Sequence, residues 1–168
     1  MDIRPALQSQ YHAGLKTLRI AVEQCPSALW GRPEDGFAAF WRVAYHTLFF
    51  THLYLQKDAP SFKQWSRHRD DAQCTGLLPH ENNRPPKACE AYTPTDILEY
   101  WREVDGMVDA CVAAMDFERT ESGFPWYPMG KLEHQLVNLR HLQHHAAILS
   151  NRLRRDASVA VPWVGKAS

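Results

Sequence analysis

Residues 131–155 read KLEHQLVNLRHLQHHAAILSNRLRR. Leucine and alanine recur in this stretch at steps of three and four residues, which is the period of an amphipathic helix. The resulting apolar stripe consists of Leu132, Leu136, Leu139, Leu142, Ala146, Leu149 and Leu153. We therefore predict a helix from about Lys131 to Arg155 that packs this stripe into a hydrophobic core.

Three other segments have the same helical period. The first begins near Pro5, which suits an initial helical turn, and is ended by Pro26. Its apolar positions are Leu7, Tyr11, Leu15, Leu18 and Val22. The second runs from about Phe37 to Gln56, is rich in aromatic residues and has Asp35 as its predicted N-cap.

The third segment begins at Thr93, the predicted N-cap, with Pro94 in the first helical position. Its apolar residues alternate steps of four and three, as in a heptad seam. They are Ile97, Trp101, Val104, Val108, Cys111 and Met115. Four amphipathic helices without any strand pattern predict an all-α fold, a four-helix bundle.

The predicted connections between these helices differ in length. The first covers about 26–36 and the third about 116–130. The second, about 57–93, is much longer than the roughly 2–8 residues usual between bundle helices. A crossover that runs the length of the bundle accounts for this length. We predict a single domain over residues 1–168 that ends in a short tail, 156–168.

The overall charge of the chain argues against two classes of partner. Lys plus Arg and Asp plus Glu number 19 each, so no net field draws the protein to nucleic acid or to an anionic membrane. The N-terminal MDIRPALQSQYH is not a secretory signal, and no apolar run approaches the roughly 20 residues that span a bilayer. The cysteines form no C-x-x-C pair, so we expect reduced thiols in the cytoplasm. They are Cys25, Cys74, Cys89 and Cys111.

Histidines are the residues that point to chemistry. His141 and His145 are four residues apart, the spacing of helical histidine pairs that chelate a metal. At 100° per residue they lie on a flank of the leucine stripe, whereas His144 falls on the solvent side. His46 lies in the middle of the apolar face of the second predicted helix. A metal bound there satisfies one buried ring nitrogen and a nearby acceptor satisfies the other.

Other roles for these and further residues stay open from the pattern alone. The histidines also fit a third alternative, a dimerising bundle without metal in which they are satisfied core residues. His12 and His134 are spare ligands or second-shell partners if a metal is bound, whereas His52 lies on a flank of its predicted helix and is less well aimed. The sequence does not identify a general base, for which Glu133, His12 and Tyr45 are the candidates.

Two stretches and the long second connection resemble one known family. Residues 138–149, NLRHLQHHAAIL, are similar to the last bundle helix of the DinB-like (DinB/YfiT) superfamily. Residues 41–52, WRVAYHTLFFTH, resemble the second helix of that family, which carries one ligand histidine after an aromatic-rich turn. The resemblance covers about residues 5–155. One departure is Ala147-Ile148, where relatives often have a Gly-Gln or Ala-Gln pair.

The resemblance implies an up-down-down-up bundle, commonly a homodimer, with three histidines on a divalent metal such as zinc or nickel. The family ligands correspond to His46, His141 and His145. Characterised relatives include S-transferases and isomerases that use low-molecular-weight thiols. Because three protein ligands leave a coordination position open, we expect a metal-dependent S-transferase or hydrolase acting on a small molecule. The alternative is a non-catalytic stress-response or binding module in which the metal is structural.

Overall fold

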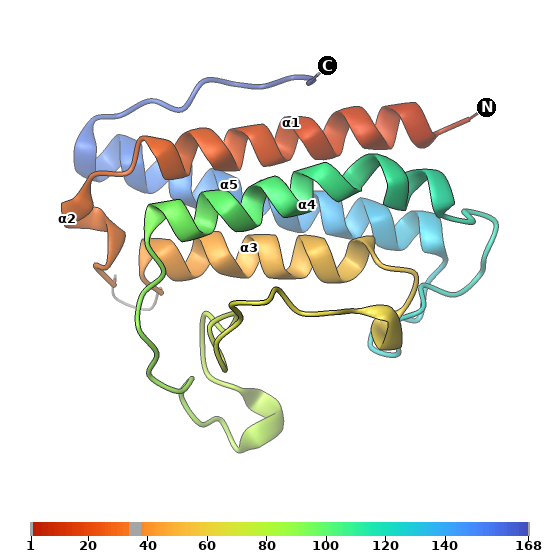
Figure 1. Cartoon of the computed structure of the whole chain (residues 1–168), viewed down its shortest axis with the longest axis horizontal. Coiled ribbons are helices and arrows are strands. Elements are labelled where there is room, and N and C mark those ends of the chain that lie inside the picture. Colours follow the sequence, from red (N-terminus) through yellow and green to blue (C-terminus); the bar gives the residue numbers. More distant parts are fainter. Residues whose placement is uncertain (1, 34–37, 168) are drawn as a thin grey trace.

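The computed structural model describes residues 2–33 and 38–167, and within them four long helices form a bundle (Figure 1). These helices are α1 (Arg4–Glu23), α3 (Phe40–Leu55), α4 (Pro94–Ala114) and α5 (Lys131–Ala157). This part of the chain contains no strand, only an isolated bridge between Leu78 and Arg84. The predicted all-α helical bundle is therefore confirmed.

Each long helix packs against two others. Both α1 and α3 pack against α4 and α5, so α1 and α3 lie opposite each other across the core. All five apolar positions predicted for the first helix are buried there. Gly14 allows α1 to approach α5 closely, because a Cβ at this position would lie 2.8 Å from Leu142 Cδ2. None of the helices described is both long enough and apolar enough to cross a membrane.

The buried face of α5 differs from the predicted leucine stripe. Leu142, Leu149 and Leu153 are fully buried, but Leu136 is 47% exposed. Polar side chains occupy the buried face in its place, including His134 and Asn138. Compared with the predicted leucine stripe, the buried face of α5 is therefore shifted around the helix toward the side that carries the histidines.

The ends of the helices test the capping predictions. At the start of α4, Asp96 N donates to Thr93 Oγ1 at 3.1 Å and Thr93 N donates to Asp96 Oδ2 at 2.8 Å, which confirms Thr93 as N-cap. The predicted N-cap Asp35 and the predicted start Phe37 lie outside the described residues, and α3 begins at Phe40. Helix α5 continues to Ala157, so the tail begins two residues later than predicted.

The connections contain short helices that the sequence analysis did not predict. Helix α2 (Ser27–Trp30) follows α1. Trp30 Nε1 donates to Tyr92 O at 2.7 Å, which ties this connection to the start of α4. Four residues are too few to show a helical period, and this explains why the pattern missed α2.

The second connection passes from the end of α3 back along the bundle to the start of α4 (Figure 1). It contains the 3₁₀ turns η1 (Ala59–Ser61) and η2 (Pro79–Glu81). Trp65 is buried and stacks on Tyr100 at a centroid distance of 4.8 Å. Arg42 Nη1 donates to Asp71 O at 2.8 Å, which fixes the loop next to α3. The crossover is therefore part of the core, and it carries residues to the site described next.

Candidate metal centre

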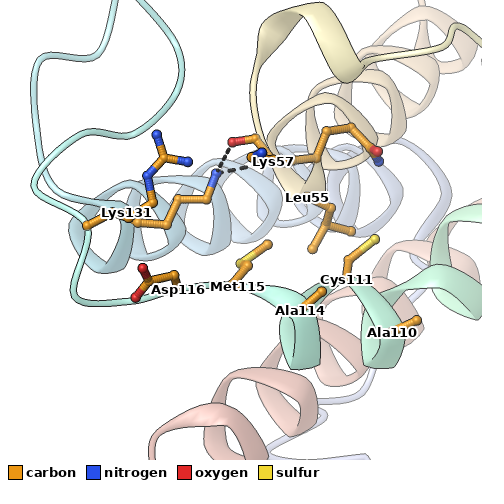
Figure 2. Close-up of a pocket in the computed structure, with 10 residues that line it drawn as sticks. Leu55, Lys57, Ala110, Cys111, Ala114, Met115, Asp116 and Lys131 are labelled. Atoms are coloured by element: carbon orange, nitrogen blue, oxygen red, sulfur yellow. Dashed lines mark hydrogen bonds between the residues drawn. The ribbon is translucent and has the colours of Figure 1, made fainter.

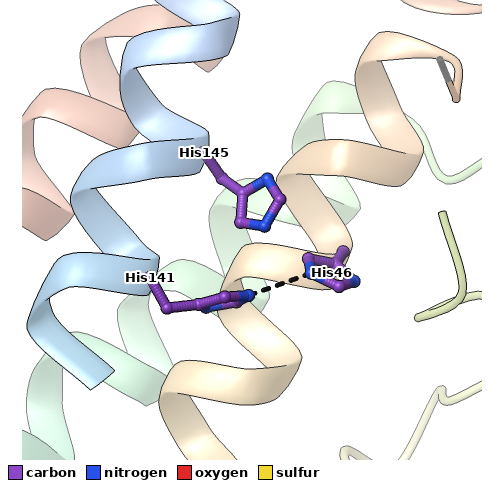
Figure 3. Close-up of side chains that lie close together, drawn as sticks. All are labelled: His46, His141 and His145. Carbon is purple, nitrogen blue, oxygen red and sulfur yellow. Dashed lines mark hydrogen bonds between the residues drawn. The ribbon is translucent and has the colours of Figure 1, made fainter. Parts of the chain in front are cut away.

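His46, His141 and His145 come together between α3 and α5 (Figure 3). One possible ligand atom from each lies within 4.8 Å of the other two. The closest pair is His46 Nε2 and His141 Nε2, which are 3.0 Å apart. Because α3 presents His46 near its middle and α5 presents the other two one turn apart, the three rings converge on one point.

The crossover orients one of these rings. His46 Nδ1 donates to the carbonyl oxygen of Gln73 at 2.6 Å. This bond places the proton on Nδ1 and leaves the lone pair of Nε2 directed at the histidines of α5. A nearby acceptor for this ring was expected from the sequence, but its identity was not. The sequence could not identify Gln73 as this acceptor, because its main-chain carbonyl accepts the bond and any residue type could supply that carbonyl.

Burial keeps all three imidazoles neutral near neutral pH. It lowers the pKa of His46 to about 4, partly opposed by the bond to Gln73. It also lowers the pKa of His141 to about 4 and that of His145 to about 3, and the neighbouring histidines add to the effect in both. Neutral imidazole is the form that binds a metal, so protons do not compete for these nitrogens at pH 7.

The donor set fits a divalent transition metal. Imidazole nitrogens bind Zn²⁺ at about 2.0–2.1 Å, so two of them on one ion lie at most about 4.2 Å apart. The 3.0 Å between His46 Nε2 and His141 Nε2 falls inside this range. Two further buried nitrogens, His141 Nδ1 and His145 Nδ1, have no hydrogen-bond partner within the described residues. An unsatisfied buried nitrogen costs about 1–3 kcal/mol. At His141 an ordered water can offset this cost, because the Nε2 of that ring is the atom that faces His46.

The three clustered histidines differ in their surroundings from the neighbouring His144. Phe50 covers one side, with ring centroids 4.7 Å from His46 and 5.6 Å from His141. His144 is exposed and lies beside His145 at a centroid distance of 4.9 Å, outside the group of three. The structure thus brings together the three predicted residues and leaves His144 on the solvent side.

Comparison with known proteins identifies the family of the chain. A family model described as the DinB superfamily matches residues 10–149. The chain belongs to the DinB superfamily. The match includes all three clustered histidines, and it bears out the resemblance seen in the sequence. Comparisons with curated proteins and with solved structures gave no match.

Three other histidines of this DinB-superfamily protein, two of them predicted as spare ligands, lie elsewhere. His12 Nδ1 is 2.7 Å from Asp105 Oδ1, in the groove between α1 and α4. His52 Nδ1 is 3.0 Å from Tyr100 Oη. His134 is fully buried, and its ring stacks on Phe124 at a centroid distance of 4.8 Å. None of the three belongs to the cluster. The spare-ligand hypothesis is therefore wrong for His12 and His134, and packing or ion pairing explains all three residues.

The candidate general bases are also placed by the structure of this DinB-superfamily protein. Tyr45 is buried, and its hydroxyl lies 2.7 Å from His68 Nδ1. Glu133 is exposed in the first turn of α5, two turns before His141. His12 is held by carboxylates of α4. The geometry therefore assigns none of these three residues to the cluster.

Proposed function

We propose that this DinB-superfamily protein binds one divalent transition metal ion, zinc or nickel, through His46, His141 and His145. We further propose that it is an enzyme acting on a small molecule. One observation carries this proposal: within the described residues, the group that is able to hold a metal consists of three histidines without a fourth protein ligand. Three ligands leave a position open for water or substrate, whereas structural zinc sites are usually closed by four.

The reaction class follows from what an open site offers. When bound, a divalent ion there supplies either a water of lowered pKa or a thiolate held for attack. The residues of the chain prepare the site. Gln73 O fixes the tautomer of His46, and Phe50 shields His46 and His141 from water on one side. We propose S-transfer from a low-molecular-weight thiol as the reaction, with hydrolysis as the second candidate.

We extend the proposal to the order of the helices, the cellular location and the oligomeric state of the protein. An up-down-down-up order of the long helices is supported by Figure 1, in which α3 and α4 run the same way and α1 and α5 run opposite to them. A cytoplasmic location is supported by the four cysteines, all of which are unpaired. The homodimer stays a prediction from the resemblance.

Elemental analysis of protein purified without a His-tag and without added metal tests the binding. We expect about one equivalent of transition metal per chain. His46→Ala, His141→Ala and His145→Ala should each abolish it, and the matched control His144→Ala should retain it. Loss of metal from His144→Ala but not from His141→Ala would refute the assignment of ligands.

A second experiment separates the enzyme from the alternative structural module. Cobalt replaces zinc with visible absorption bands that depend on its ligands. If a position is open, added low-molecular-weight thiols should shift these bands in the cobalt-substituted protein. Bands that do not respond to thiols, together with a fourth protein ligand, would support the non-catalytic module.

A further inference from the structure

A cavity of about 490 Å³ lies between the end of α3, the last turns of α4 and the start of α5 (Figure 2). Leu55 in its wall is nine positions after His46 in α3, or about 13 Å of helix rise, so the cavity is separate from the histidine cluster. Its volume falls in the range of about 300–1,000 Å³ that ligand pockets have. The floor of the cavity is apolar and consists of Leu55, Ala110, Cys111, Ala114 and Met115.

A buried ammonium forms part of the opposite wall. Lys131 is only 2% exposed, and its Nζ donates to the carbonyls of Gln56 and Lys57 at 3.0 Å and of Ser122 at 2.9 Å. These bonds fix the ammonium in place but do not neutralise its charge. Burial and, to a smaller extent, the neighbouring Arg119 together lower the pKa of Lys131 to about 8, against the opposing effect of Asp58. A cation in this state gains from a nearby anion.

A second cation lies beside the first. The carbonyl of Arg119 accepts a bond from Lys131 N at 3.0 Å, which fixes the backbone of Arg119 at the cavity edge. The Arg119 guanidinium itself makes no hydrogen bond or ion pair with any residue that the structure describes. Asp116, on the same wall, accepts from Glu118 N at 3.1 Å and is paired with neither cation among the described residues. A planar guanidinium without a partner is suited to a carboxylate or phosphate group.

We propose that this cavity binds a small amphipathic anion, with an alkyl chain on the apolar floor and a carboxylate or phosphate head at Arg119. The apolar floor and the two cations together disfavour ligands that match only one of these features. An inorganic anion leaves the floor of Leu55, Ala114 and Met115 uncovered. A neutral apolar molecule brings no charge to Arg119 and Lys131, whose counter-charge among the described residues is the carboxylate of Asp58, and a cationic amphiphile is repelled by both cations. The proposal does not depend on the metal site.

Calorimetric titration of the full chain with octanoate and octyl phosphate tests the ligand class. We expect at least one of the two to bind, and the stronger of them identifies the preferred head group. Octanol and acetate, which each lack one half of the ligand, should bind at least about tenfold more weakly. Absence of binding by both octyl anions would overturn the proposal, as would equally tight binding of octanol.

Variants locate the bound molecule. Arg119→Gln should weaken binding of the octyl anions about tenfold or more and leave octanol unchanged. Ala114→Leu should abolish binding of the anions by filling the floor. Ala113→Leu is the matched control, because it adds the same side chain at the neighbouring exposed position outside the cavity. If Ala114→Leu binds octanoate like Ala113→Leu, the ligand lies elsewhere and the assignment is wrong.

Discussion

Gly123 is a position at which one added methyl group should destabilise the protein. Its φ of +89° lies in the region that L-residues rarely adopt. A Cβ there would lie 2.5 Å from the carbonyl oxygen of Lys57 and 3.0 Å from Asp58 Cα. The Gly123 carbonyl also accepts from Ala59 N at 3.1 Å, so the two segments cannot separate without losing this bond.

The size of the effect follows from these two contributions. Holding an L-residue at positive φ costs about 1–2 kcal/mol. A shift that relieves the contact with Lys57 O weakens a backbone hydrogen bond worth about 0.5–1.5 kcal/mol. Gly123→Ala should therefore lower the free energy of unfolding by about 2–3 kcal/mol.

A second glycine provides a control of opposite sign. Gly106 lies inside α4, is exposed, and a Cβ there would have no neighbour within 4 Å. Because alanine forms helix more readily than glycine, Gly106→Ala should raise the free energy of unfolding by roughly 1 kcal/mol.

Urea denaturation followed by far-ultraviolet circular dichroism measures both changes. The reasoning would be refuted if Gly123→Ala unfolded at the urea concentration of the wild type. It would also be refuted if the two variants changed stability in the same direction.

Three further predictions concern charge and metal. Lys131→Met leaves three carbonyl groups without their donor and should cost about 3 kcal/mol or more in urea denaturation, while the exposed control Lys57→Met should change stability by less than about 0.5 kcal/mol. Burial lowers the pKa of His12, but its bonds to two aspartates of α4 outweigh burial and raise the pKa above 6.5. The wild type should therefore have a higher free energy of unfolding than His12→Gln below pH 6.5. This difference should disappear as the pH rises through the raised pKa, as measured by urea denaturation at successive pH values. If the metal binds as proposed, a chelator should lower the melting temperature of the wild type in calorimetry but not that of His141→Ala.

The sequence predicted the parts of the fold that repeat along the chain. Burial of one helix face requires a period near 3.6, so the leucines of α5 and the apolar residues of α1 were visible without coordinates. The same geometry placed His141 and His145 on one side and His144 on the other, as the structure does. The facing was wrong for Leu136, because the polar residues His134 and Asn138 replace leucine on the buried side.

The features that were missed depend on contacts between distant residues. The carbonyl of Gln73 reaches His46 through the path of the crossover, and no side-chain pattern encodes that path. The cavity beside Arg119 and Lys131 arises where three helix ends meet, and the two cations are not related by any period. Helix α2 is too short to have a period at all.

The clustered histidines join parts of the chain that are far apart in sequence. His46 and His141 are separated by 95 positions, and the whole crossover lies between them. If the proposed ion binds to histidines of both α3 and α5, it closes a very long loop in the unfolded chain and so restricts the unfolded state. A covalent bridge over a loop of about 100 residues is worth about 4–5 kcal/mol in the chain-entropy model. If so, the proposed ion would link α3 to the last helix of the chain, and its removal would destabilise the bundle as well as the site.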